Sequence, residues 1–216
     1  MNKTDLKLYA ITDRQWLHGA RLSEHVKLAI EGRATMIQIR DKDILSTDSD
    51  AGLNDEYKEA LEIKRICHEH KVPLIINDNV QFAIDIDADG VHLGQDDMNP
   101  AEARKLLGTD KIIGVTAKTV EQAKRAEADG ADYLGSGAVF GSTTKLNAKP
   151  MTKELLREIT AAVDIPVVAI GGINADNAAT LKGTGIAGIA VVGAIFASAD
   201  IKAAAKELAE ICDKML

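Results

Sequence analysis

Short apolar runs recur along this chain and alternate with longer segments of helical periodicity. A run that is apolar at nearly every position has to be covered on both faces, which is typical of strands in parallel sheets. The strand-like runs are residues 6–12, 36–40, 73–77, 90–93, 111–115, 133–135, 166–170 and 188–192. The helical patterns are residues 22–31, 55–70, 80–86, 100–107, 120–129, 152–162, 176–182 and 201–215. The alternation predicts repeated β/α units around a parallel sheet.

Eight such units in 216 residues match an α/β fold of the (β/α)8 TIM barrel type, with a single domain over residues 1–216. A doubly wound sheet is the alternative, but it usually carries a glycine-rich loop after its first strand. Here the first run is followed by Asp13-Arg14-Gln15-Trp16, which contains no glycine. With 46% hydrophobic but only 3% aromatic residues, the core has to be built from aliphatic side chains, which a barrel allows.

The net charge of −7 argues against nucleic acid or an anionic membrane as partner, because both require a basic face. Small phosphorylated substrates need only local positive charge and are therefore compatible with the negative net charge. Cys67 and Cys212 have no metal-ligand spacing and indicate free thiols in a reducing compartment. No segment resembles a signal peptide or a membrane span, so we expect a cytoplasmic protein. The sequence does not determine the oligomeric state, and a homo-oligomer is one of the possible states.

Two polar clusters stand directly after apolar runs, where the strands of a barrel end. They read Asn77-Asp78-Asn79 and Gly94-Gln95-Asp96-Asp97. Active sites of barrels form at the carboxyl ends of the strands, so these clusters meet at one mouth. Asp78 and Asp97, with Asp96 as a rival, offer the oxygen ligands that Mg²⁺ takes together with substrate phosphate. The alternative is that Asp78 and Asp97 are helix N-caps, because each precedes a helical pattern.

The second strand-like run ends in charged and amide side chains. Gln38 and Arg40 are two residues apart on one strand and therefore point to the same side. That side is expected to be the mouth, because a buried arginine without a partner is costly. Arg40, Lys42 and Lys145 would supply charge for a pyrophosphate, and arginine can contact two oxygens at once.

Other strand ends suggest a second anion site. Gly171-Gly172 and Gly193 follow the seventh and eighth runs and resemble the paired phosphate-binding loops of many barrels. Residues 135–149 combine small, hydroxyl and basic side chains, which suits closure over a phosphate. Residues 43–54 lack periodicity and are expected to form a long loop. The mouth is thus expected to hold two anionic groups, a pyrophosphate and a monophosphate.

Several segments together resemble the thiamine-phosphate synthase family, also called thiamine-phosphate pyrophosphorylase. They are LYAITD at 8–13, IQIRDK at 37–42, IINDN at 75–79, GVHLGQDD at 90–97, TTK at 143–145 and AIGGI at 169–173. The resemblance covers nearly the whole chain, and the two polar clusters are its most specific part. It implies a transferase that joins 4-amino-2-methyl-5-(diphosphooxymethyl)pyrimidine to thiazole phosphate, giving thiamine monophosphate and pyrophosphate. Pyrophosphate would leave first, and the thiazole nitrogen would capture the pyrimidine-methyl cation.

The resemblance also implies roles for individual residues. Asp78 and Asp97 would bind Mg²⁺, which favours Asp97 over Asp96. The pyrimidine pyrophosphate would contact Gln38, Arg40, Lys42, Asn77, Thr116 and Lys145, of which Arg40, Lys42, Thr116 and Lys145 are the candidate catalytic residues. The thiazole phosphate would contact Ser142, Thr143, Thr144, Gly172 and the backbone of Val192 and Gly193. Gly193 stands where the family often has serine, so one side-chain contact to phosphate is missing.

Three other functions stay open. A thiazole tautomerase-like paralogue would bind thiazole phosphate without using metal and pyrophosphate. The residues that argue against it are Arg40, Lys42, Asn77, Asp78, Asp97 and Lys145. A sugar-phosphate isomerase or epimerase would need an acid/base pair at the mouth, and none can be assigned. A non-catalytic barrel that binds thiamine phosphates would bind product without turnover. His92 is expected to be a hydrogen-bonded barrel residue rather than a general base.

Overall fold

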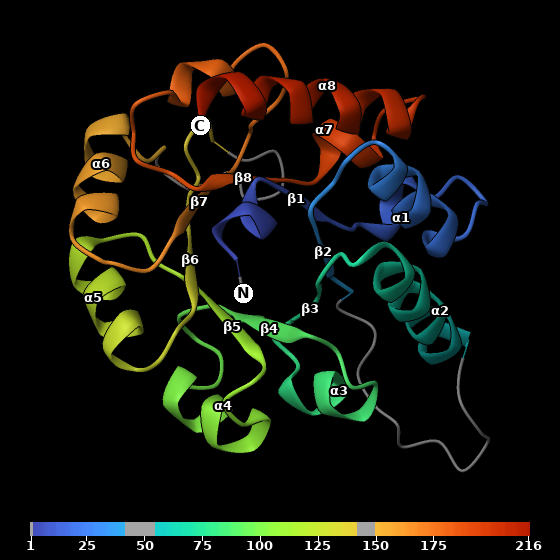
Figure 1. Ribbon diagram of the computed structural model, residues 1–216, viewed down its shortest axis with the longest axis horizontal. Coiled ribbons are helices and arrows are strands. Elements are labelled where there is room, and N and C mark those ends of the chain that lie inside the picture. The colour runs from blue at the N-terminus through green and yellow to red at the C-terminus, as the bar shows by residue number, and fades with distance from the viewer. Residues whose placement is uncertain (1, 42–54, 142–149) are drawn as a thin grey trace.

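The computed structural model describes residues 2–41, 55–141 and 150–216. Eight parallel strands form a closed barrel in sequence order (Figure 1). The strands are β1 (Leu8–Ile11), β2 (Met36–Ile39), β3 (Leu74–Asn77), β4 (Gly90–Leu93), β5 (Ile112–Thr116), β6 (Tyr133–Gly137), β7 (Val167–Ile170) and β8 (Gly188–Val191). Strand β8 pairs with β1 and closes the sheet. The predicted TIM barrel is confirmed, and individual strand ends differ from the prediction by one or two residues.

Helices surround the barrel on its outer side, as Figure 1 shows. They are α1 (Leu22–Glu31), α2 (Asp55–His70), α3 (Val80–Asp85), α4 (Pro100–Leu107), α5 (Val120–Ala128), α6 (Lys153–Ala161), α7 (Gly193–Phe196) and α8 (Ile201–Met215). Short 3-10 helices are η1 (Lys3–Leu6), η2 (Arg14–Trp16) and η3 (Ala178–Leu181). The bounds of α1, α2, α4 and α8 agree with the predicted helical patterns.

The helix predicted over residues 176–182 is wrong in type, because only the 3-10 helix η3 forms there. The side chain of Asn174 accepts hydrogen bonds from the backbone N–H groups of Asp176 (3.0 Å) and Asn177 (3.2 Å). Such local turns compete with α-helix formation. Gly183, with φ of +76°, follows directly and takes the chain away. The short helices η1, η2 and α7 were not predicted.

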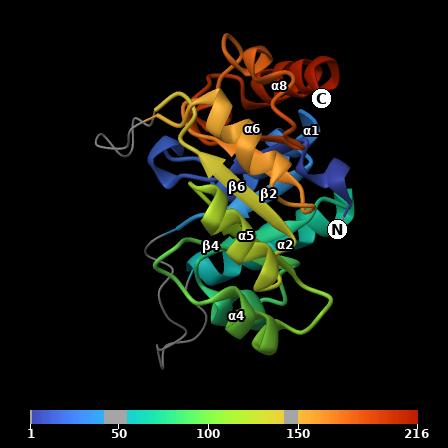
Figure 2. The same cartoon turned by 90° about the vertical axis from the view of Figure 1, so that its left-hand side faces the viewer.

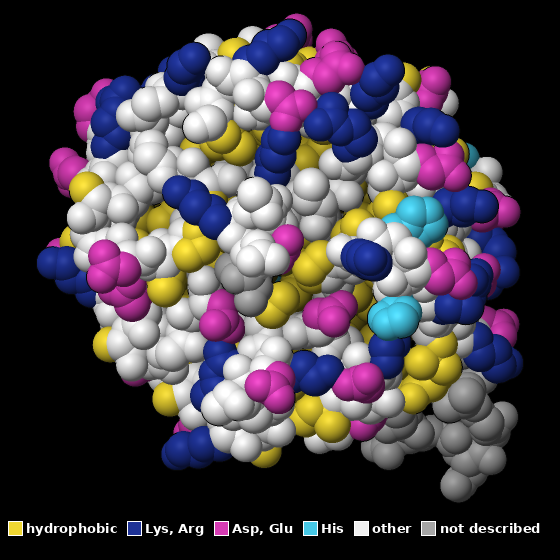
Figure 3. Space-filling model, in the orientation of Figure 1, with side chains coloured by type: hydrophobic (Ala, Val, Ile, Leu, Met, Phe, Trp, Pro, Cys, Tyr) yellow, Lys and Arg dark blue, Asp and Glu magenta, His cyan; other side chains and the backbone are white. Residues whose placement is uncertain are grey.

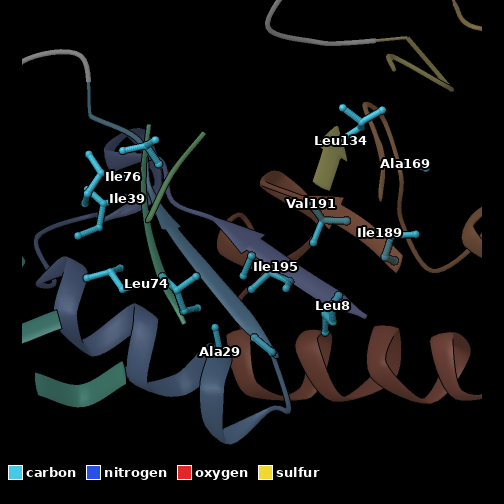
Figure 4. Close-up of a cluster of buried hydrophobic side chains, with 14 of the residues drawn as sticks. Leu8, Ala29, Ile39, Leu74, Ile76, Leu134, Ala169, Ile189, Val191 and Ile195 are labelled. Carbon is cyan, nitrogen blue, oxygen red and sulfur yellow. The ribbon is translucent and has the colours of Figure 1, made fainter. Parts of the chain in front are cut away.

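Alternation of side chains along the strands divides the core into two layers. Side chains that face outward pack against the helices, and Figure 4 shows Leu8, Ala29 and Leu74 in this layer. Side chains that face inward form a separate, smaller cluster that includes Tyr9 and Tyr133. Strands of a parallel barrel are buried on both faces, which explains why their sequences are mainly apolar. Gln38 of β2 and His92 of β4 are exceptions.

The strands point away from the side on which the two chain termini lie, as strand β6 shows in Figure 2. Their carboxyl ends therefore form the opposite mouth, where the polar clusters of the sequence stand. None of the helices in the described ranges is long and apolar enough to cross a membrane. On the face shown in Figure 3, basic and acidic side chains are interspersed, and the residues drawn in colour form no continuous basic area there.

Candidate active site

Two carboxyl groups meet at the carboxyl-end mouth of the barrel. Asp78 follows β3, and its carboxyl group lies close to that of Asp97 in the loop after β4. Desolvation of the carboxyl, followed by the hydrogen bond and charge of Asp97, raises the pKa of Asp78 to about 6. Asn77 and Arg40 act in the opposite direction. The carboxyl that acts on Asp78 is that of Asp97 and not that of Asp96.

Neither aspartate caps a helix, so the N-cap alternative is wrong. The side chain of Asn79 accepts from the backbone N–H of Phe82 at 2.9 Å and caps α3. In the same way, the side chain of Asn99 accepts from the N–H of Ala101 at 2.8 Å and caps α4. Both helices already have their caps, and the carboxylates are left for another role.

Local backbone geometry directs the two carboxylates. Asp78 has a φ of +60°, a conformation that is uncommon for residues other than glycine. Its N–H donates to the carbonyl of His92 at 2.9 Å, which anchors the turn to β4. Asp97 accepts from the N–H of Gly94 at 2.7 Å and thereby closes the loop after β4. The strain at Asp78 is typical of functional sites.

An amide and a cation border the carboxylate pair. The Nδ2 of Asn77 donates to Oδ2 of Asp78 at 2.5 Å. Arg40 directly follows β2 and lies near enough for its charge to lower the pKa of Asp78. Its own backbone N–H donates to Oγ1 of the buried Thr12 at 3.1 Å. The structure thus brings Arg40, Asn77, Asp78 and Asp97 together, as the sequence predicted.

The inner wall below this mouth is a connected set of polar side chains. Gln38 is only 2% exposed, and its Nε2 donates to the hydroxyl of Tyr9 at 2.5 Å. The hydroxyls of Tyr9 and Tyr133 are 2.9 Å apart. His92 lies 3.0 Å from the Tyr133 hydroxyl through Nδ1 and 3.0 Å from Thr116 Oγ1 through Nε2. Gln38 and Thr116 were predicted site residues, whereas Tyr9 and Tyr133 were missed.

Burial determines the protonation of this wall. Desolvation lowers the pKa of His92 to about 4, and the nearby charge of Asp97 only partly opposes this. Desolvation also raises the pKa values of Tyr9 and Tyr133 well above that of an exposed tyrosine. At neutral pH the imidazole is therefore uncharged and both phenols keep their protons. His92 is hydrogen-bonded on both ring nitrogens, as expected, and it is a poor candidate for a base.

The glycines after β7 lie close to the segment after β6. Gly172 has a φ of +65°, and a Cβ there would come within 2.8 Å of the carbonyl oxygen of Phe140. The N–H of Phe140 donates to the carbonyl of Gly171 at 3.0 Å. Only glycine permits this contact between the two loops. Val192 and Gly193 follow β8, and Gly193 begins α7.

Five predicted site residues lie outside the described residues. They are Lys42, Ser142, Thr143, Thr144 and Lys145. Within residues 2–41, 55–141 and 150–216, no group of three or more His, Cys, Asp or Glu side chains could hold a metal ion. A cation at the Asp78–Asp97 pair would therefore take its remaining ligands from substrate or water, which is common for Mg²⁺.

The fold and the mouth define the class of protein: a (β/α)8-barrel enzyme with its polar site at the carboxyl ends of the strands. The model of the family described as thiamine monophosphate synthase matches residues 8–195. The chain belongs to this family, and it is a transferase of thiamine biosynthesis.

Individual relatives agree with this assignment. The chain is 48% identical to the thiamine-phosphate synthase of Ruminiclostridium cellulolyticum, covering 97% of both chains. It is 44% identical to the thiamine-phosphate synthase of Clostridium acetobutylicum, over 99% of this chain and 98% of that protein. The solved structure of thiamine phosphate pyrophosphorylase from Pyrococcus furiosus superimposes with a TM-score of 0.87 at 39% identity, covering 99% of this chain and 98% of that one.

Proposed function

We propose that this chain condenses 4-amino-2-methyl-5-(diphosphooxymethyl)pyrimidine with thiazole phosphate, releasing thiamine monophosphate and pyrophosphate. The observation that carries the proposal is the close approach of the Asp78 and Asp97 carboxyl groups, which raises the pKa of Asp78, with Arg40 near enough to oppose that shift. Two carboxylates held this close repel each other when both are ionised, and helix capping does not account for them. A site that brings a cation and a polyphosphate to this place does account for them.

The donor set fits Mg²⁺, because both side chains offer hard carboxylate oxygens and Asn77 adds an amide. Asp78 and Asp97 would hold the ion, with substrate phosphate completing its ligands. When bound, Mg²⁺ would supply positive charge that stabilises the departing pyrophosphate. The raised pKa of Asp78 is consistent with this role, since a bound cation would relieve the repulsion from Asp97 that contributes to it.

Residues of the chain itself would assist departure of the leaving group. Arg40 is placed near the carboxylate pair and would bind pyrophosphate oxygens through its guanidinium. Lys42 and Lys145 would add further charge on the same leaving group. With these cations in place, loss of pyrophosphate would give a pyrimidine-methyl cation, which the thiazole nitrogen captures. Catalysis would rest on electrostatic stabilisation and positioning, without a protein nucleophile.

The inner wall would bind the pyrimidine. Gln38 and Thr116 stand at the two ends of the hydrogen-bonded set across the barrel, and both would contact the ring. The imidazole of His92, whose pKa is near 4, would stay neutral and would add no positive charge that repels the cationic intermediate. The two cysteines lie in the outer core layer, away from this wall.

Thiazole phosphate would bind on the other side of the mouth. Gly172 and the backbone of Val192 and Gly193 would donate N–H groups to its phosphate. Ser142, Thr143 and Thr144 would complete the site with hydroxyl groups. The close contact between the segments after β6 and β7 supports this, because it places the two loops side by side.

The direct test mixes both substrates with Mg²⁺ and measures pyrophosphate release. The proposal predicts release that requires both the thiazole phosphate and the metal ion. Each substrate alone, and both substrates with excess chelator, are the controls. Product formation without the metal ion, or no release from both substrates at saturation, would contradict the proposal.

A further inference from the structure

Five side chains from five different strands or strand ends form one unbroken line of hydrogen bonds across the barrel interior. In order they are Gln38, Tyr9, Tyr133, His92 and Thr116. The line crosses from β2 through β1, β6 and β4 to β5. The two residues at its ends are the ones proposed above to contact the pyrimidine, while Tyr9 and Tyr133 in the middle had no assigned role.

The number of protons on this line is fixed by the protonation states of its members. A doubly protonated His92 would donate from both ring nitrogens and leave one of the two buried tyrosine protons without an acceptor, so one ring nitrogen donates and the other accepts. Tyr9 and Tyr133 keep their phenolic protons and each has one to donate. Both tyrosines are fully buried, at 1% and 0% exposure, so each hydroxyl proton has to be used within the line.

The amide of Gln38 then sets the direction of every bond. Its Nε2 can only donate, so the Tyr9 oxygen accepts and Tyr9 donates to Tyr133. Tyr133 in turn donates to Nδ1 of His92, which places the imidazole proton on Nε2. Nε2–H donates to the hydroxyl oxygen of Thr116, whose own proton is then free for a substrate.

Each end of the line has a polar group that can bind a ligand. The carbonyl oxygen of Gln38 makes no hydrogen bond to another side chain or backbone group in the described ranges, so it is available as an acceptor. The main-chain carbonyl of Thr116 is fixed by Nε2 of Gln95 at 2.6 Å, and Arg125 holds Gln95 through Oε1 at 2.9 Å. The backbone of Thr116, and with it the position of the hydroxyl, is therefore fixed by the side chains of Gln95 and Arg125.

A glycine on β5 leaves the space in which two side chains of this line meet. Gly114 of β5 stands in register between His92 of β4 and Tyr133 of β6. A Cβ at Gly114 would come within 2.1 Å of the Tyr133 ring, so glycine is required for Tyr133 to reach across to His92. The rings of His92 and Tyr133 have centroids 5.5 Å apart. The absence of a side chain at Gly114 thus permits the hydrogen bond between Tyr133 and His92.

We propose that this line is a one-way relay that fixes the hydrogen-bonding polarity of the pyrimidine site. Gln38 presents an acceptor and Thr116 presents a donor, a pair that matches the exocyclic amino group and adjacent ring nitrogen of an aminopyrimidine. Tyr9, Tyr133 and His92 are positioning residues that select the 4-amino ring over a 4-oxo ring, whose donor and acceptor are exchanged. The inference rests on the proposed function for its ligand, but the direction of the relay does not.

The direction is tested without turnover, by NMR of the full chain with ¹⁵N-labelled histidine. Long-range ¹H–¹⁵N correlations report which ring nitrogen carries the proton, and loss of signals in His92→Gln assigns the residue. The relay predicts the neutral Nε2–H form of His92 at pH 7, and loss of this single form in Tyr133→Phe. An Nδ1–H form or an imidazolium at pH 7 would overturn the relay, whether or not the protein is active.

Selectivity is tested with the 4-amino substrate and its 4-oxo analogue. Tyr9→Phe and Tyr133→Phe are each expected to reduce the ratio of kcat/KM for amino over oxo by about three- to tenfold, the equivalent of one neutral hydrogen bond. Tyr57→Phe is the matched control, because the Tyr57 hydroxyl contacts the carbonyl of Asp85 on α3 and lies outside the relay. An unchanged ratio in an active Tyr133→Phe enzyme would contradict the relay, while an inactive wild-type enzyme would contradict only the proposed function.

Discussion

Adjacent residues after β3 carry out different tasks. Asn79 caps α3 through its side chain, while Asp78 adopts a left-handed backbone and turns its carboxyl to Asp97. A non-glycine residue in that conformation costs about 1 kcal/mol or more, and such strain persists where surrounding structure enforces it. The hydrogen bond from the N–H of Asp78 to the carbonyl of His92 is part of that enforcement.

His92 makes the stability of the fold depend on pH. Its pKa is about 4 in the folded chain, below its ordinary value of 6.5, so it contributes full stability above pH 6.5 and loses it as pH falls toward 4. His92→Gln removes this dependence. Between pH 7 and pH 4.5, urea unfolding should show the wild type losing about 2 kcal/mol more than the variant. Equal losses in the two proteins would show that His92 titrates normally in the fold.

Gly193 leaves space for a hydroxyl at the proposed thiazole phosphate site. A Cβ there would have its nearest contact at 3.9 Å, to Cβ of Ala197, so Gly193→Ser should fold normally. The added hydroxyl should lower KM for thiazole phosphate by about fivefold, the value of one hydrogen bond. Gly193→Ala is the control that adds the Cβ alone. If serine and alanine change KM equally, the hydroxyl does not reach the phosphate.

The sequence predicted the polar residues at strand ends and the buried Gln38, but not the two tyrosines inside the barrel. Asp78 and Asp97 stand out because carboxylates directly after apolar runs have little structural reason to be there. Tyr9 and Tyr133 lie within apolar runs, where a tyrosine is an ordinary core residue. Their meeting depends on the register of β4, β5 and β6 and on the missing side chain at Gly114, which a single sequence does not encode visibly.

At the scale of elements, helices of eight or more residues with a clear apolar face were the easiest to predict. Asn99 caps α4, and Pro100 occupies the first turn as its fixed φ favours. The start of α4 was predicted correctly for this reason. Residues 176–182 have helical spacing too, but the Asn174 side chain captures the first N–H groups and only η3 forms. Four-residue elements such as α7 are too short for periodicity to reveal.

The cap of α3 should contribute stability without contributing to catalysis. Asn79→Ala leaves the N–H of Phe82 without its acceptor and should lower the free energy of unfolding by about 1 kcal/mol. Pyrophosphate release at saturating Mg²⁺ should stay near the wild-type rate. Thermal or urea unfolding together with the release assay measures both quantities. A large loss of activity at unchanged stability would place Asn79 in the site and contradict this division of roles.

At the scale of the whole molecule, closure of the barrel creates the site. Asp78 and Asp97 come from neighbouring strands, whereas Gln38 and Thr116 come from β2 and β5. The parallel arrangement brings all of these strand ends to one mouth, away from the chain termini (Figure 2). The alternating β/α pattern was sufficient to predict this arrangement, because eight units in this length favour a closed barrel.

The central claim is that the Asp78–Asp97 pair serves the reaction and not the fold. The most direct measurement is Mg²⁺-dependent pyrophosphate release by Asp78→Ala, made alongside its free energy of unfolding without metal. We predict a rate at least about 100-fold lower, because a ligand of the metal that stabilises the leaving group is gone. The unfolding free energy should be unchanged or higher, since repulsion from Asp97 is relieved. A parallel loss of activity and stability would contradict the claim.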